Sequence, residues 1–435
     1  MRQLKESLHE KRAMPDGSST AHLYKPKLAT VLNEGYSAAA FQKDLAAALT
    51  VAVVALPLSM AIAVASGVGP ERGLYSAVIG GFLVSALGGS RFQIGGPAGA
   101  FIVLVAAAVA QFGIEGLVIA VLLSGVMLTL IGLCRLGALI RYMPHAVTVG
   151  FSCGIAVTIL ASQLKDFGGL VLPVAEPGPL PEKLVVLAAA LPSLNVSACA
   201  IGAGSAALIF ALRYVRPNWP GMLIAVAAAA LVAFVFQLPV ETIGSRFGSV
   251  PGGLPGPRLP DVSRWLELLP TALSFTLLGA AESLLSAKVA DGMTGRKHRY
   301  NMELVAQGIA NIATSFFGGI SVTGTIARTA TNIRAGARSP LSGMMHSVFL
   351  LIFMLAGARL ASFIPLSALA GVLVVVCWNM AEKKEFAVLL RDWRTAVVLL
   401  ATFGLTLAKD LTVGIIAGCL LAGVLAALGR PIPKE

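Results

Sequence analysis

Charged residues are scarce in this chain. Asp, Glu, Lys and Arg make up 12% of its 435 residues, whereas 57% are hydrophobic and the mean hydropathy is +0.83. Soluble globular domains carry about 25% charged residues, so this composition excludes a water-soluble fold. Apolar runs of about 17 to 25 residues, the length that crosses a bilayer as a helix, recur between Ala46 and Leu428. We therefore predict an all-α polytopic membrane protein.

Cysteines are also few, and their spacing suits neither disulfides nor a metal site. No apolar segment follows Met1 closely, which excludes a cleavable signal peptide. The net charge of +12 lies in short loops between apolar runs, so it does not indicate nucleic-acid binding. We predict no metal, no cofactor and no nucleic-acid partner, and interpret the cysteines as small core residues: Cys134, Cys153, Cys199, Cys377 and Cys419.

Hydropathy predicts fourteen transmembrane segments, two of them short and interrupted by glycine, at 95–112 and 324–337. With the N-terminus in the cytoplasm, 24 of the 33 Lys and Arg residues fall in inner loops and 8 in outer loops. This bias predicts a multi-pass protein of a bacterial-type inner (plasma) membrane with both termini cytoplasmic. The expected parts are a cytoplasmic segment (1–44), a first half (45–238), a Pro- and Gly-rich external linker (239–264) and a second half (265–430).

The two halves resemble each other around their interrupted segments. Each interrupted segment is the third span of its half and begins with a short β-like stretch, followed by glycine and a helix. Because each half has an odd number of spans, the second half must cross the membrane upside down, as a 7+7 inverted repeat. The alignment pairs Ile94 with Val322, Gly96 with Gly324 and Ala100 with Arg328.

The interrupted spans predict an anion site. A helix that starts inside the membrane has unpaired N–H groups and about half a positive charge at its N-terminus. The repeat brings two such ends, near Pro97 and Thr325, face to face at the midplane, with Pro97 in the first helical turn. Glycines are expected to admit the ligand and hydroxyls to donate to it: Gly95, Gly96, Gly99, Gly324, Ser321, Thr323 and Thr325.

Arg328 lies about one turn inside the second half-helix. A guanidinium at bilayer depth costs on the order of 2.5 to 3.5 kcal/mol, so we interpret Arg328 as a source of positive potential for the bound anion. The structural alternative is that Arg328 reaches the cytoplasmic surface or forms an ion pair.

Glu282 lies in the middle of the eighth span, with Ser286 one turn further along the same face. We interpret this carboxyl as a group that binds and releases a proton in each cycle. The alternative is a structural salt bridge to Arg328 or Lys288. Glu303, at the head of the ninth span, is interpreted as a residue that complements the helix dipole.

Several stretches resemble the SulP family of anion permeases over about residues 45–428. The resemblance implies a core domain (spans 1–4 and 8–11) that moves like an elevator past a gate domain (spans 5–7 and 12–14), often in a dimer. The stretches are "PERGLYSAVIGGF", "GGPAGAF", "AESLLSAKVADGMTG", "NMELVAQGIAN" and "GGISVTGTIARTATN".

The resemblance also implies site residues and coupling. Family members that couple to sodium tend to place a hydroxyl where this chain has Ile326 and an aspartate where it has Glu282, so proton coupling is favoured. The family usually continues into a cytoplasmic STAS domain, whereas this sequence stops at Glu435. The implied substrate-binding residues are Pro57, Ile62, Gly96, Pro97, Ala98, Gly99, Phe101, Thr325, Ile326, Ala327 and Arg328, and the implied proton-coupling residues are Glu282 and Ser286.

We therefore predict a secondary active transporter, not an enzyme, that carries sulfate, bicarbonate or a dicarboxylate such as fumarate together with protons. Its other expected contacts are membrane lipids and a second copy of the chain. A nucleobase symporter would need acidic or amide groups on both the eighth and tenth spans, where the tenth offers Thr325 and Arg328. An anion channel would conduct without saturation, and an intramembrane enzyme would need a nucleophile with its base or a metal cluster.

Overall fold

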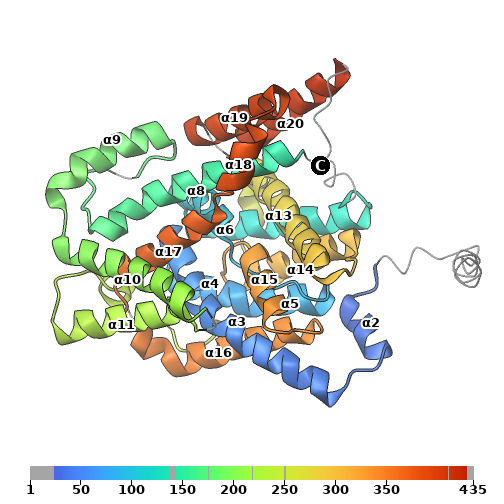
Figure 1. Ribbon diagram of the computed structural model, residues 1–435, viewed down its shortest axis with the longest axis horizontal. Coiled ribbons are helices and arrows are strands. Elements are labelled where there is room, and N and C mark those ends of the chain that lie inside the picture. Colours follow the sequence, from blue (N-terminus) through green and yellow to red (C-terminus); the bar gives the residue numbers. More distant parts are fainter. Residues whose placement is uncertain are drawn as a thin grey trace, which may run out of the picture.

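The computed structural model describes residues 24–137, 144–174, 176–217, 219–248, 251–409 and 411–428. In this part the chain is almost wholly helical, and the helices pack in two groups (Figure 1). The first group contains α3 (Ala38–Ala65), α4 (Pro70–Tyr75), α5 (Gly81–Leu87), α6 (Ile102–Leu133), α13 (Trp265–Thr294), α14 (Tyr300–Phe316), α15 (Ile326–Arg334) and α16 (Leu341–Ala361).

The second group lies beside the first and meets it through the contacts of α3 with α11 and α17 and of α6 with α8. Two short helices, α2 (Lys27–Asn33) and α12 (Ile243–Phe247), belong to the connecting segments. The members of the second group are α8 (His145–Gly168), α9 (Leu180–Ala190), α10 (Val196–Val215), α11 (Gly221–Val235), α17 (Leu366–Met380), α18 (Lys383–Leu389), α19 (Trp393–Ala408) and α20 (Leu411–Ala427).

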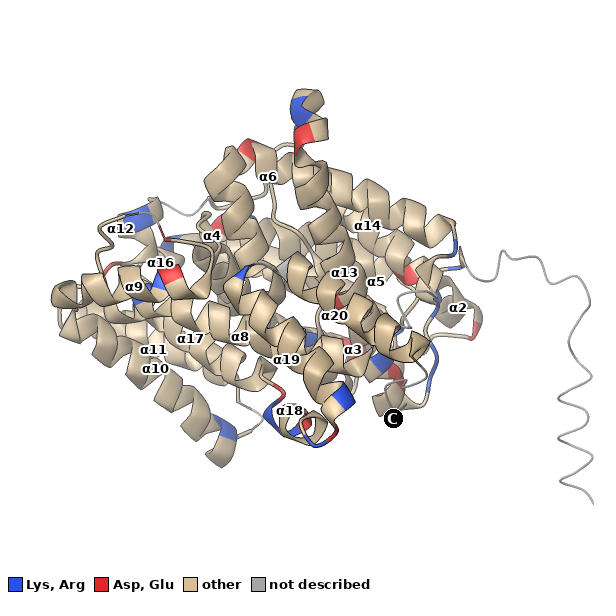
Figure 2. Cartoon of the chain, turned by 90° about the horizontal axis from the view of Figure 1, so that it is seen from above, with Lys and Arg blue, Asp and Glu red and all other residues tan. Residues whose placement is uncertain are grey.

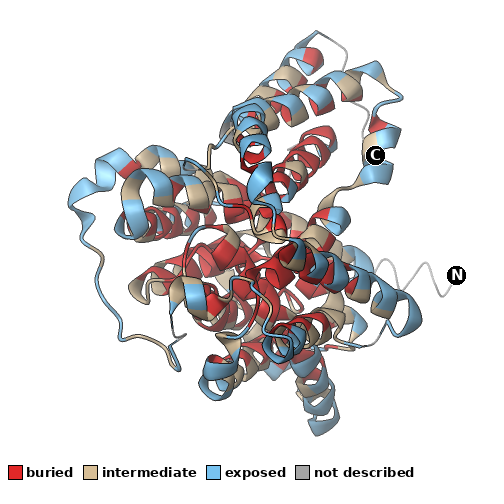
Figure 3. Ribbon diagram, turned by 90° about the vertical axis from the view of Figure 1, so that its left-hand side faces the viewer, coloured by how far each residue is buried: buried red, intermediate tan, exposed pale blue. Residues whose placement is uncertain are grey.

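Seven helical stretches of the described chain are long and apolar enough to cross a membrane, which confirms the polytopic helical fold. Charged residues lie mainly on loops and helix ends (Figure 2). Buried residues gather in the interior, while the outer helices turn exposed faces outward (Figure 3). Many of those exposed residues are large and apolar, as expected of a surface that contacts lipid.

The two interrupted segments are present as predicted. The stretch from Gly99 to Leu133 bends sharply at Gly113, where φ is 69° and ψ is −174°, so its first part is a short helical segment that ends at Phe112. The second interrupted segment is α15, which has only 9 residues. The total of fourteen crossings stays a prediction, because several helices are shorter than a full crossing.

A buried carboxylate fixes the start of the first long helix. Asp44, in α3, accepts hydrogen bonds from the N–H groups of Arg338 (2.6 Å) and Ser339 (3.1 Å), and from the hydroxyl of Tyr36 (2.5 Å). These bonds tie α3 to the loop between α15 and α16. The end of the second half-helix is therefore held by the beginning of the chain's first span.

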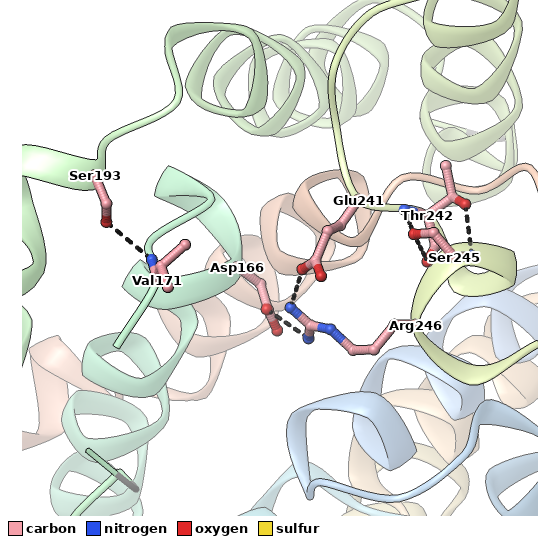
Figure 4. A network of polar contacts seen from close by, with 7 residues as sticks. All are labelled: Asp166, Val171, Ser193, Glu241, Thr242, Ser245 and Arg246. Carbon is pink, nitrogen blue, oxygen red and sulfur yellow. Dashed lines mark hydrogen bonds and ion pairs between the residues drawn. The ribbon is translucent and has the colours of Figure 1, made fainter. Parts of the chain in front are cut away.

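The linker between the halves is held against the second group of helices. Arg246, in α12, pairs with Asp166 at the end of α8 (2.8 Å) and with Glu241 (Figure 4). A reciprocal cap between Thr242 and Ser245 starts α12. The linker thus stays ordered near the helix ends although it is too polar to cross the membrane.

Parts of the predicted terminal segments lie outside the described residues. These are residues 1–23 of the cytoplasmic N-terminal segment and residues 429–435 at the C-terminus.

Candidate anion site

The two interrupted segments meet as an antiparallel pair of very short strands, β1 (Gly95–Gly96) and β2 (Thr323–Gly324). Gly95 pairs with Gly324 and Gly96 with Thr323. One bond extends the ladder, since the N–H of Thr325 donates to the carbonyl of Ile94 over 3.0 Å. The pairing gives irregular backbone its hydrogen bonds inside the protein, which is required wherever backbone interrupts a span.

A helix starts directly after each strand, so both N-termini lie at the same ladder. On the first side Ala98 caps a helical turn at Gly99–Phe101, which leads into α6, and on the second side Thr325 caps α15. Pro97 therefore precedes the cap instead of lying in the first turn as predicted. Neither cap residue bonds the following amides with its side chain, so the first-turn N–H groups, including those of Ile326 and Ala327, are left for a ligand or solvent.

Arg328 brings a buried positive charge to this point. Its side chain crosses to the first half, where Nη2 donates to the carbonyl of Pro97 (3.3 Å) and to Oγ of Ser59 on α3 (3.2 Å). Arg328 is only 2% exposed, and its Nε and Nη1 have no hydrogen-bond partner among the described residues. The alternative of a guanidinium that reaches the surface is therefore wrong for this conformation.

Gly96 makes room for that guanidinium. A Cβ atom built on Gly96 would lie 2.3 Å from Nη1 of Arg328, which is closer than any side chain tolerates. A side chain at this position would therefore force the guanidinium to move. A guanidinium without a counter-ion beside open helix N-termini favours a negatively charged ligand.

Glu282 and Ser286 lie on α13, next to this site. Glu282 is half-buried and has no hydrogen-bond or ion-pair partner in the described part of the chain, so the predicted alternative of a salt bridge to Arg328 or Lys288 is not found. The Ser286 hydroxyl donates to Oγ1 of Thr329 over 3.2 Å, which joins α13 to α15. An unpaired carboxyl that keeps some exposure can exchange protons.

Other predicted site residues lie in different surroundings. Pro57 lines an apolar cavity of about 240 Å³ between α3, α11 and α16, and Ile62 is packed in the core. Phe101 is buried and stacks on Phe275 of α13, with 5.7 Å between ring centroids. Gly99 is half-buried and faces Ile159 of α8 across the boundary between the two helix groups.

Three predicted hydroxyl donors are engaged with protein groups instead of being free for a ligand. Ser321 donates to Oδ1 of Asn311 (3.2 Å), Thr323 to the carbonyl of Gly279 (3.2 Å) and Thr325 to the carbonyl of Ile94 (3.1 Å). They satisfy the interrupted backbone and its neighbours. The anion's donors are therefore expected to be amides and the guanidinium.

Several residues of the site were missed by sequence reasoning. Thr329 accepts a hydrogen bond from the N–H of Ile94 (3.1 Å), and the Asn332 amide donates to the carbonyl of Phe92 (3.0 Å). Gln93 donates to the Ser283 hydroxyl (2.8 Å). His346 is fully buried within α16. The sequence signal that could have identified these residues is a polar side chain inside an apolar span.

Comparisons with known proteins identify the family of this chain. A sequence profile described as the sulfate permease family matches residues 41–402. YvdB of Bacillus subtilis (strain 168) is 46% identical over 395 residues, which cover 90% of this chain and 74% of YvdB.

Solved structures show the same fold. The transmembrane domain of a cyanobacterium bicarbonate transporter, BicA, matches with a TM-score of 0.76 and 29% identity, over 87% of this chain and 97% of that one. The overall structure of SLC26A9 matches in fold with a TM-score of 0.85 and 20% identity, over 93% of this chain and 68% of that one. The predicted transporter, as opposed to an enzyme, is confirmed. The chain belongs to the sulfate permease family of anion transporters.

Proposed function

We propose that this protein carries a small oxyanion, which binds beside the β1–β2 ladder between the Arg328 guanidinium and the starts of the two half-helices. Sulfate, bicarbonate and a dicarboxylate such as fumarate are the candidate substrates. The matching family is that of sulfate permeases, and the structurally similar BicA is a bicarbonate transporter. An oxyanion offers several acceptor oxygens, which suits a pocket of amides and one guanidinium.

The observation that carries this proposal is the state of Arg328. Two of its three nitrogens lack hydrogen-bond partners among the described residues, although the side chain is buried. A buried charge without an opposite charge is costly, and a bound anion removes that cost. Ile326 is half-buried and Ala327 is exposed, so the start of α15 is open to an incoming ligand.

Proton coupling is the second part of the proposal. Glu282 is the acidic residue of α13 in the middle of the helix, and it lacks a partner within the described residues. Uptake of a proton by this carboxyl offsets part of the anion's charge as both cross the membrane. Ile326 provides no side-chain oxygen for a sodium ion, which favours the proton as the coupling ion.

The transport movement is proposed to be an elevator. The first helix group, which holds β1, β2 and Arg328, corresponds to the predicted core domain, and the second to the gate domain of a 7+7 inverted repeat. An antiparallel ladder with one helix after each strand is the arrangement that inverted halves produce. We place both termini in the cytoplasm and the protein in the inner membrane, as a homodimer.

Uptake into proteoliposomes tests substrate and coupling together. Labelled sulfate, bicarbonate, fumarate and uracil are compared at two external pH values, with and without an inward proton gradient. The proposal predicts saturable uptake of at least one of the three anions, stimulated by the gradient, and no uptake of uracil. Uptake of uracil alone, or flux that rises linearly with concentration, would overturn it.

A further inference from the structure

We propose that Glu303 and Arg72 are positioning residues, which set the register of the two strands from outside the anion site. Each acts on an approach segment, meaning the residues just before a strand: 88–92 before β1 and 317–322 before β2. The inference rests on the proposed function for the anion site itself. It assigns to Glu303 a role other than helix capping, the role expected from its sequence position.

Glu303 holds the first approach segment. It lies in the first turn of α14, is 0% exposed, and its Oε2 accepts the N–H of Ser90 over 2.8 Å. The neighbouring Arg299 N–H donates to the carbonyl of Gly89 over 3.0 Å, and a Cβ on Gly89 would lie 2.2 Å from the Arg299 carbonyl oxygen. The segment is therefore pressed directly against the start of α14.

No cation pairs with Glu303 among the described residues. Its Oε1 has no hydrogen-bond partner there either. Burying a carboxyl in this way is costly, and a simple helix cap at a surface would avoid that cost. The carboxylate is thereby a strong acceptor for the backbone amides of Gly89 and Ser90, the latter five residues before the first residue of β1.

Arg72 and Ser76 hold the second approach segment. Nη1 of Arg72, in α4, donates to the carbonyl of Gly318 over 2.5 Å. Ser76, one turn further on, donates to the carbonyl of Ile320 (2.9 Å) and accepts its N–H (2.7 Å). A cation thus binds a carbonyl here, whereas an acid binds an amide at the first segment.

In each contact, a helix of one half of the chain binds the approach segment of the other half. The α4 region precedes β1 in the chain but holds the segment before β2, whereas α14 precedes β2 and holds the segment before β1. The helix α14 also holds Val322, whose N–H donates to Oδ1 of Asn311 over 2.9 Å. Both strands are thereby located by the same helix, which fixes the distance from Gly96 to Arg328.

Transport kinetics test this role. Glu303→Ala is expected to raise the KM for labelled sulfate, or for whichever anion the proteoliposomes take up, about tenfold with a smaller change in Vmax, since misplacing a site weakens binding. Glu303→Gln keeps an acceptor oxygen for Ser90 and is expected to stay within about twofold of the parent KM. Arg72→Gln and Ser76→Ala test the other contact, and each is expected to raise KM about threefold.

Thr276→Ala is the matched control, because Thr276 is equally buried, bonds Ser124 (3.2 Å) and lies away from both approach segments. It is expected to lower the Tm without changing KM. A lower Tm with unchanged KM in both Glu303→Ala and Ser76→Ala would overturn the proposal, as would a Glu303→Gln protein that loses stimulation by the proton gradient. Failure of the proposed function is distinct, because Arg328→Ala would then transport normally.

Discussion

The starts of the two half-helices differ sharply in chemistry. The first, from Gly95 to Phe101, has no polar side chain, so its only polar groups are those of the backbone. The second, from Thr323 to Asn332, carries a guanidinium, hydroxyls and an amide. The two starts fit together at one point, because the Arg328 side chain of the second occupies the room left by Gly96 of the first.

This difference explains why polar side chains gather in the second of the two segments. The N–H of Ile94 and the carbonyl of Phe92 belong to the first segment, but Thr329 and Asn332 of the second segment bind them. The polar half-helix therefore satisfies backbone groups of the apolar segment opposite it. In this half-helix, Nε and Nη1 of Arg328 have no partner among the described residues, so they are available to an anion.

The largest effect is expected from removing the charge of the second half-helix. Arg328→Ala should reduce anion uptake about 100-fold, corresponding to ~2.7 kcal/mol in the barrier. Arg334→Ala is the matched control, because Arg334 is exposed in the last turn of the same helix. Uptake assays on both variants check the prediction, and equal uptake would show that the charge is structural.

Proton coupling should depend on α13, the helix beside the β1–β2 ladder. Glu282→Gln is expected to abolish the stimulation of uptake by an inward proton gradient, because glutamine cannot carry a proton. Glu267→Gln, on the exposed first turn of the same helix, should leave the stimulation intact. Uptake with and without the gradient measures the difference, and persistent stimulation in Glu282→Gln would assign coupling to another group.

A smaller loss is expected from adding a side chain at Gly96, where the first half-helix begins. Gly96→Ala places a methyl group against Nη1 of Arg328 and should lower uptake about tenfold by displacing the guanidinium. A Cβ on Gly292 of α13 would meet nothing within 4 Å, so Gly292→Ala is the control. If both variants transport equally well, the close approach of the two segments is wrong.

The smallest effect concerns the support of the ladder. Thr329→Val leaves the buried N–H of Ile94 without its acceptor, which should cost about 1 to 3 kcal/mol of stability. Thr331→Val, on the same helix, removes only a bond to the helix's own Ala327 carbonyl. Thermal unfolding of the two proteins compares them, and an equal Tm would mean that Thr329 contributes nothing to the ladder.

Sequence reasoning located the interruptions because glycines and hydroxyls stand out in apolar runs. It placed Thr325 at a helix start and Arg328 within one turn of it, and the structure agrees. It could not foresee that the hydroxyls serve the backbone, because hydrogen-bond partners distant in sequence decide that. For the same reason Glu303 resembled an ordinary cap, and only the structure reveals Ser90 opposite its carboxylate.

Protection of an introduced cysteine would show most directly whether an anion binds where the half-helices meet. Ala327 is exposed at the start of α15, so Ala327→Cys, with the five native cysteines replaced, should react with a thiol reagent. We predict that the transported anion slows this reaction with a half-maximal concentration close to its KM, while Gly292→Cys reacts at a constant rate. Unchanged reactivity of Ala327→Cys at saturating anion, in a variant that still transports, would contradict the account.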